Sequence, residues 1–212
     1  MAHYDLEEQE QIDSLKTWWK MYGNLVTGVI TAACLAVVAW QGWTWYQNGQ
    51  AAKAAGVYAV LEQALQTGDV QKIKAASGEL TEKFSGSSYA ALGAMLAAKQ
   101  SFESGDLKTA KTQLAWVAEN GSDELRDLAR LRLAAVQLDE QAYDEALKQL
   151  GAGHAPAFDS RFLELKGDVL SAQGKKADAR MAYKSALEKL GEKQLAGREL
   201  LQQKLDSLGE AT

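Results

Sequence analysis

The stretch from Gly167 to Ala186 reads GDVLSAQGKKADARMAYKSA and decides the fold. Its positions 167, 170 and 174 hold glycine, leucine and glycine, and positions 179, 183 and 186 hold alanine, tyrosine and alanine. Two antiparallel helices pack closely only where a small side chain on one helix faces a large side chain on the other. The stretch therefore predicts two helices joined by a turn at Gly174.

This turn has three counterparts earlier in the chain, which begin at Gly68, Gly105 and Gln141. The residues that close the four motifs, at positions 73, 110, 146 and 179, are spaced by 37, 36 and 33 residues. A tetratricopeptide repeat, which is one helix–turn–helix unit, has a period of about 34 residues. We therefore predict an all-α fold with an α-solenoid of about four tetratricopeptide-like helix pairs. An irregular helical bundle is the alternative.

The position of Gly167 is occupied by Ala98 and Ala134 in the two preceding pairs and by Leu61 in the first pair. A leucine at this position predicts that the first pair is degenerate or acts as a cap. After the last pair, an amphipathic stretch from Leu195 to Leu208 has leucines at positions 200, 201, 205 and 208. We expect this stretch to close the open end of the solenoid.

A long uncharged gap lies between Lys20 and Lys53, with no Asp, Glu, Lys or Arg. Within it, the 22 residues from Leu25 to Tyr46 are mostly apolar. They would form a helix about 33 Å long, and a bilayer core is about 30 Å thick. Five of the six tryptophans cluster at the two ends of this run, where amphipathic rings prefer the headgroup region. The gap therefore predicts one membrane-spanning helix.

A buried core helix and a cleavable signal peptide are the alternatives to this span. Core helices are usually shorter and rarely carry aromatic residues at both ends. The first 13 residues contain five acidic and no basic residues, so the basic start of a signal peptide is missing. We therefore divide the chain into an acidic cytoplasmic tail over residues 1–20, a transmembrane helix over residues 21–48 and a tetratricopeptide-like domain over residues 49–212.

The lysines around the span predict its orientation. Lys16 and Lys20 flank its N-terminal end, whereas only Lys53 flanks the other end. Positive residues are more frequent on the cytoplasmic side, so we expect the N-terminus inside the cell and the repeats outside the cytoplasm. Within the span, one helix face carries small residues that would let another helix approach closely: Gly28, Ala32 and Ala36. The alternative is that these residues are simply common in membrane helices.

Composition and motifs argue against several function classes. The chain has 23 basic and 28 acidic residues, whereas nucleic-acid binding depends on an excess of basic side chains. The soft metal ligands His3, Cys34 and His154 are far apart in sequence, so we predict no metal site and no cofactor. No catalytic motif is present, and we predict no enzymatic activity. His154 lies in a Gly-Ala-Gly-His-Ala-Pro loop, where we expect it to be exposed to solvent.

Stacked helix pairs offer a concave surface that binds peptides or partner proteins. Alignment of the pairs by their turn residues gives the side chains that we expect to face it: Met95, Lys99, Phe102, Leu131, Leu138, Arg161, Glu164 and Asp168. An apolar stretch that runs into a charged one suits a polypeptide that is not yet folded. The alternative is that the four apolar side chains belong to the core.

The N-terminal region resembles that of a known family. It begins with LEEQEQI over residues 6–12 and continues with Leu15-Lys16, Trp18-Trp19-Lys20 and Tyr22-Gly23-Asn24. These residues resemble the start of the YfgM family, whose members are ancillary subunits of the SecYEG translocon. The resemblance extends through the tail, the single span that ends in tryptophans and the degenerate repeats.

The resemblance implies a bacterial inner-membrane protein whose C-terminal domain lies in the periplasm. It implies three kinds of partner: the SecYEG translocon, a PpiD-type periplasmic chaperone and exported polypeptides. We expect an adaptor that links exported proteins to periplasmic chaperones. A regulator of envelope-stress signalling that acts through the cytoplasmic tail, and a scaffold for envelope assembly, are the alternatives.

Overall fold

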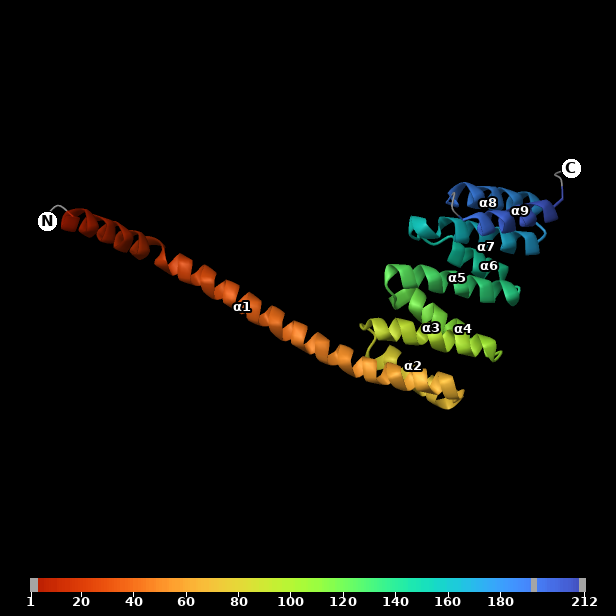
Figure 1. Ribbon diagram of the computed structural model, residues 1–212, viewed down its shortest axis with the longest axis horizontal. Helices are drawn as coiled ribbons and strands as arrows, with labels where there is room; N and C mark the ends of the chain where they lie inside the picture. The colour runs from red at the N-terminus through yellow and green to blue at the C-terminus, as the bar shows by residue number, and fades with distance from the viewer. Residues whose placement is uncertain (1–3, 192–193, 210–212) are drawn as a thin grey trace. The chain divides into compact units, whose positions relative to one another are not determined.

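The predicted all-α fold is confirmed by a computed structural model, which describes residues 4–191 and 194–209, with side chains from residue 11 onward (Figure 1). These residues form two compact units that divide after Gln50. The helices are α1 Tyr4–Thr67, α2 Val70–Lys83, α3 Ser88–Glu103, α4 Leu107–Asn120, α5 Asp123–Asp139, α6 Tyr143–Leu150, α7 Asp159–Ala172, α8 Lys176–Lys189 and α9 Leu195–Ser207, with a 3-10 turn at Pro156–Phe158.

The first unit is the N-terminal part of α1, a helix that continues without a break past residue 48. Its apolar side chains are exposed: Val29, Ile30 and Leu35 are 61%, 55% and 66% accessible. Exposed apolar surface on this scale is unfavourable in water, whereas the hydrocarbon of a bilayer accepts it. Among the described residues, α1 alone is long and apolar enough to cross a membrane.

The second unit begins at residue 51, and its described residues form a stack of helix pairs that follow one another in chain order (Figure 1). Every predicted turn has a residue in the left-handed backbone region. Glycine adopts this conformation without strain, which explains Gly68, Gly105 and Gly174, with φ of 69°, 80° and 76°. Gln141, with φ of 60°, fills the same position in the third turn. The predicted repeat spacing therefore corresponds to four equivalent turns.

Backbone hydrogen bonds have the same pattern at all four turns. The N–H that follows each left-handed residue donates to the carbonyl five residues before it, as in Asp106 to Ser101 at 2.8 Å and Lys175 to Leu170 at 2.9 Å. These bonds satisfy carbonyl groups at the helix end that would otherwise have no hydrogen-bond donor. Each turn thus ends one helix and begins the next within three residues.

The core consists of four clusters, each shared by helices that are neighbours in the stack. The first cluster joins the end of α1 with α2 and α3, and the second joins α3, α4 and α5. The third joins α5, α6 and α7, and the fourth joins α7, α8 and α9. Because every cluster connects one pair to the next, burial of apolar surface stabilises the stacking as well as each pair.

Packing within the last pair depends on Gly167. A Cβ atom at this position would lie 2.4 Å from Cε1 of Tyr183, closer than van der Waals contact permits. The Tyr183 ring is buried and its hydroxyl donates to Oδ1 of Asp168 at 2.7 Å, so the ring has little freedom to move away. The predicted match of a small residue on α7 with a large one on α8 is confirmed.

In the first pair the large and small residues have exchanged places. Leu61 stands at the position of Gly167 and is fully buried, and Ser77 stands at the position of Tyr183 and is 1% exposed. The exchange keeps the summed volume of the two positions near that of the other pairs, which close packing demands. Degeneracy in this pair therefore alters the identity of the residues and leaves the helix pair intact.

The closing helix α9 begins at Leu195 and packs on the last pair, as predicted. Leu201, Leu205 and Leu208 join the core cluster of α7 and α8. Leu200, which we expected on the same apolar face, is 46% exposed. It lies one residue before Leu201 and hence about 100° away around the helix, so the two side chains do not share one face.

Candidate partner-binding surface

Three of the eight predicted surface residues contribute to the hydrophobic core. Met95 is 6% exposed and lies in the cluster of α3, α4 and α5, and Leu131 is 9% exposed and lies in the cluster of α5, α6 and α7. Leu138 is half-buried against the same cluster of α5, α6 and α7. The alternative interpretation, that these apolar residues are core, describes all three. Phe102, at 43% exposure, is the apolar member of the set that remains open to solvent.

Two of the predicted charged residues face α9. Lys204 Nζ donates to Oε1 of Glu164 and to Oδ2 of Asp168, each at 2.7 Å. The Tyr183 hydroxyl donates to the other oxygen of Asp168. We call these four side chains the Lys204 cluster. Since both carboxylates are already bound within the chain, they hold α9 on α7 in this structure.

Burial and charge shift the pKa values within the Lys204 cluster. Burial alone would lower the pKa of Lys204, but the hydrogen bonds to Asp168 and Glu164 outweigh burial and raise it. Burial, followed by the hydrogen bond to Asp168, raises the pKa of Tyr183. Lys204 therefore stays charged and Tyr183 stays neutral at physiological pH.

The exposed residues Lys99 and Phe102 border an apolar hollow between α3 and α5, with a volume of about 290 Å³. We call this feature the α3–α5 hollow. Its lining residues come from three helices: Ala98, Lys99 and Phe102 on α3, Leu114 on α4, and Arg132, Ala135 and Val136 on α5. The lining combines apolar side chains with two basic ones and contains no acidic residue. It therefore suits an apolar group that carries negative charge nearby.

The remaining predicted residue, Arg161, is exposed on α7 and does not line the α3–α5 hollow. The eight residues thus lie in three places: the core, the Lys204 cluster and the exposed surface of α3 and α7. Of the set, the hollow brings together Lys99 and Phe102.

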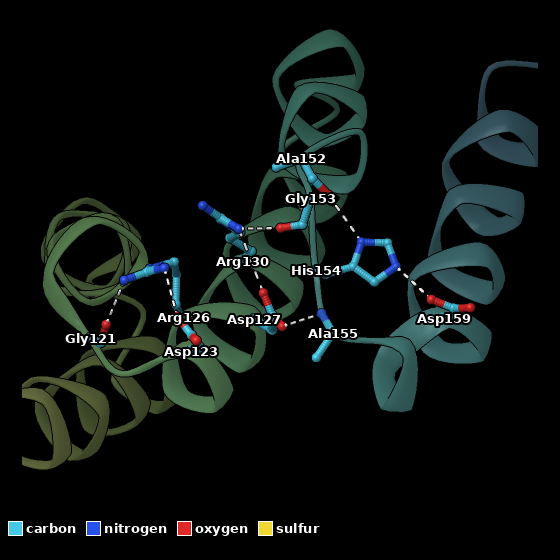
Figure 2. Close-up of polar contacts among 10 residues, drawn as sticks. All are labelled: Gly121, Asp123, Arg126, Asp127, Arg130, Ala152, Gly153, His154, Ala155 and Asp159. Atoms are coloured by element: carbon cyan, nitrogen blue, oxygen red, sulfur yellow. Dashed lines mark hydrogen bonds and ion pairs between the residues drawn. The ribbon is translucent and has the colours of Figure 1, made fainter.

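A polar network ties the loop before α7 to helix α5 (Figure 2). Asp127 is 3% exposed, and its Oδ2 accepts a hydrogen bond from the N–H of Ala155 at 2.8 Å. Arg130 donates to the carbonyl of Gly153 at 2.7 Å and lies 3.6 Å from Oδ1 of Asp127. A buried carboxylate needs such partners to offset the loss of its hydration. The network therefore fixes where α7 begins relative to α5.

His154 belongs to this loop, and our prediction that it is exposed to solvent is wrong. Its side chain is 20% exposed, and its ring stacks on Phe162 with 3.9 Å between the centroids. Nε2 lies 3.3 Å from Oδ1 of Asp159, the first residue of α7 (Figure 2). These contacts give His154 a packing role at the start of α7. Among the described residues, no group of three or more His, Cys, Asp or Glu side chains could hold a metal ion.

Comparisons with known proteins agree with this architecture. A family model described as a tetratricopeptide repeat-like domain matches residues 16–210. The ancillary SecYEG translocon subunit of Neisseria gonorrhoeae is 36% identical over 208 residues, which cover 96% of this chain and 98% of the relative. The proteins of the same name from Haemophilus influenzae and Escherichia coli are 30% and 29% identical, and the matches cover 86% and 95% of this chain and 90% and 96% of those relatives.

The chain belongs to the YfgM family of ancillary SecYEG translocon subunits. The resemblance seen in the N-terminal region is therefore confirmed, and it extends over nearly the full length of the chain. The tetratricopeptide-like nature of the repeats is confirmed by the same comparisons.

Sequence reasoning missed the α5 side of the hollow, and Arg132 in particular. The repeat offers a signal that could have found it. The position of Arg132 is occupied by Leu96 in the preceding pair and Leu165 in the following pair. A basic residue at a position that holds leucine in both adjoining pairs indicates a surface that differs locally from these neighbours.

Among the described residues of the first unit, the small-residue face of the span has no neighbour. Gly28, Ala32 and Ala36 are exposed, and a Cβ atom at Gly28 would meet no atom within 4 Å. Gly23, one turn earlier, is buried under the indole of Trp19, whose Nε1 would lie 3.2 Å from its Cβ atom. The predicted contact of this face with another membrane helix stays a prediction.

Proposed function

We propose that this protein is a single-pass inner-membrane adaptor of the SecYEG translocon with no enzymatic activity. The observation that carries the proposal is the match with the Neisseria gonorrhoeae subunit, because it covers the span and the repeats together. An anchor next to a repeat domain suits an adaptor, since confinement in the membrane raises the effective concentration of weakly bound partners.

The proposed topology follows from the lysines around the span. Residues 1–20 would form a cytoplasmic tail, residues 21–48 the transmembrane helix, and residues 49–212 the periplasmic domain. The small residues Gly28, Ala32 and Ala36 would face a membrane helix of the translocon. This arrangement would place the repeats on the side of the membrane where exported chains emerge.

The proposed partners of the repeat domain are exported polypeptides and a PpiD-type periplasmic chaperone. The α3–α5 hollow supports this part of the proposal, because its apolar lining is open to solvent and extends to the exposed ring of Phe102. An unfolded polypeptide presents apolar side chains that such a surface would bind. The adaptor would hold these chains before a chaperone receives them.

The test is photo-crosslinking in native membranes. A photoreactive amino acid would replace Phe102 or Arg132 in the hollow, or Met181 on α8 as a control that is 61% exposed and lies outside the hollow. We expect channel subunits, the chaperone and exported polypeptides among the products identified by mass spectrometry, with fewer from position 181. If neither channel nor chaperone subunits are captured, the adaptor proposal is wrong. Capture of cell-wall enzymes instead would support a scaffold for envelope assembly.

Deletion of residues 1–17 separates the adaptor from a regulator that acts through its tail. The adaptor should keep its association with the translocon, measured by co-purification, because the span and repeats remain. Loss of this association would count against a periplasmic binding surface, and unchanged envelope-stress signalling would count against the regulator.

A further inference from the structure

The size of the α3–α5 hollow limits what it can hold. Small-molecule sites typically have volumes of about 300–1,000 Å³, so a hollow of about 290 Å³ is at the lower end of that range. It has room for one or two apolar side chains of a polypeptide. Leu114 and Val136 are buried, whereas Phe102 is 43% exposed, so apolar surface extends from the floor to the rim.

The charged residues of the hollow are both basic and lie on two different helices. Lys99 Nζ is 3.7 Å from Oε1 of Glu103, an exposed pair along one helix that contributes little. Arg132 makes no ion pair and no side-chain hydrogen bond within residues 11–191 and 194–209. A guanidinium group binds carboxylates through two parallel hydrogen bonds. The lining therefore offers an unoccupied partner for an acidic side chain.

The last pair shows how the same repeat position is used elsewhere in the chain. Asp168 is the counterpart of Lys99, and it is bound by Lys204 of the neighbouring helix α9. At this repeat position, the negative charge of Asp168 on α7 is therefore paired with the positive charge of Lys204 on a packed helix. Because Lys99 is positive, the group that would pair with it is a carboxylate.

We propose that the α3–α5 hollow binds a polypeptide segment in which an aliphatic or aromatic side chain lies close to an aspartate or glutamate. The apolar side chain packs on Phe102 and Leu114, and the carboxylate pairs with Arg132 and Lys99. This inference rests on the proposed adaptor function and adds the chemistry of the segment that is recognised. It selects acidic segments over neutral and basic ones of equal hydrophobicity.

The experiment uses the full-length protein in lipid nanodiscs and three short fluorescein-labelled peptides. The peptides share the same leucine and phenylalanine residues and differ in two positions, which are aspartate, asparagine or lysine. At low salt, we expect the aspartate peptide to bind about tenfold more tightly than the asparagine peptide, measured by fluorescence anisotropy, since charge-assisted hydrogen bonds are about twice as strong as neutral ones.

Two substitutions test the charge and the apolar surface separately. Arg132→Glu should weaken binding of the aspartate peptide about tenfold and reverse the preference in favour of the lysine peptide. Phe102→Ala should weaken the binding of all three peptides about equally, because it removes apolar contact area and no charge. The matched controls are Arg198→Glu and Leu200→Ala, which are exposed positions on α9 and should leave binding unchanged.

Equal binding of the aspartate and asparagine peptides would overturn the inference, as would no binding of any peptide up to about 1 mM. An unreversed preference in Arg132→Glu would do the same, provided that far-UV circular dichroism shows a folded variant. Self-association that Phe102→Ala abolishes, measured by mass photometry, would make a second copy the occupant and would also overturn it.

Co-purification of SecYEG subunits from native membranes, measured in parallel, tests the adaptor function separately. If the channel co-purifies but the peptide preference is absent, the inference about the hollow fails alone. If the protein prefers the aspartate peptide but SecYEG subunits do not co-purify, the adaptor proposal fails and the inference about the hollow stands.

Discussion

Gly167 sets the distance between α7 and α8, because no larger residue fits over the ring of Tyr183. We expect Gly167→Ala to lower the free energy of unfolding by about 1–3 kcal/mol, the usual cost of overpacking in a core. Urea unfolding of the full-length protein in detergent, followed by circular dichroism, measures the change.

A matched control is Gly78→Ala in α2, where an added Cβ atom would meet nothing within 4 Å. That substitution should stabilise the helix by about 0.5–1 kcal/mol. The pairs Ala98 with Leu114 and Ala134 with Leu150 occupy the equivalent positions. Adding Tyr183→Leu to Gly167→Ala should therefore restore part of the lost free energy of unfolding. A double variant that is no more stable than Gly167→Ala alone would contradict this explanation.

Asp106 makes stability depend on pH at the start of α4. Its carboxylate accepts hydrogen bonds from Lys74 Nζ at 2.8 Å and from the hydroxyl and N–H of Thr109, and these bonds lower its pKa from 3.8 to about 2. A lowered pKa means that the charged form favours the folded state. This contribution is fully present above pH 3.8 and is lost as the pH falls through about 2.

The substitution Asp106→Asn tests this contribution, because asparagine still caps the helix but carries no charge. We expect the variant to have a lower Tm than the unsubstituted protein near neutral pH, with a difference that shrinks below about pH 4. Asp144→Asn, which removes a charge that has no ion pair among the described residues, is the control. A difference that stays constant down to pH 2 would rule out the proposed linkage.

At the residue scale, sequence predicted well where the reason was local and failed where it was tertiary. All four turns were visible in the sequence, three from their glycines and the turn at Gln141 from the repeat spacing. The partial burial of His154 was not visible, because it depends on Phe162 and Asp159, which become its neighbours only when α7 folds back beside the loop. The pairing of Lys204 with Glu164 and Asp168 spans 40 and 36 residues, respectively, and carries no sequence signal of its own.

At the scale of one element, α9 depends on the Lys204 cluster for its attachment. Lys204→Met removes a half-buried cation and leaves two carboxylates facing each other. We expect the free energy of unfolding to fall by about 1–3 kcal/mol, the cost of leaving charged hydrogen-bonding groups unpaired. Hydrogen exchange followed by mass spectrometry should show faster exchange in α9 than in the other helices.

Lys83→Met is the control, since Lys83 is 66% exposed and, among the described side chains, pairs only with Glu79 on its own helix. Surface pairs of this kind contribute about 0.3–0.5 kcal/mol. Neutralising the carboxylates as well, with Glu164→Gln and Asp168→Asn, should restore part of the stability lost in Lys204→Met. Equal losses in Lys204→Met and Lys83→Met would show that the cluster does not hold α9.

The existence and type of each element were largely predictable, because apolar periodicity and turn residues act within one helix pair. Which side chains remain exposed was less predictable. Met95 and Leu131 occupy the expected helix face, but the neighbouring pair covers them in the folded chain. Phe102 is not covered in this way, because it lies near the C-terminal end of α3, where the α3–α5 hollow is open.

At the scale of the whole molecule, the orientation in the membrane is the property that a labelling experiment decides most directly. Cys34 lies within the span and would first be replaced by serine. A single cysteine at Ser14 or at Gly153 would then be treated with a membrane-impermeant maleimide after the outer membrane is permeabilised. We expect the cysteine at position 153 to be labelled while the inner membrane is intact, and the cysteine at position 14 only after lysis, because the positive residues favour a cytoplasmic N-terminus. The reverse pattern would contradict the proposed topology.

The four core clusters, each shared only between adjoining pairs, have a consequence for how such a chain changes length. A whole pair, about 34 residues, can be gained or lost while the remaining interfaces keep their partners. An insertion of a few residues inside a helix would instead rotate every later side chain away from its neighbour. Variation in family members should therefore come in complete pairs or be confined to the bends between helices.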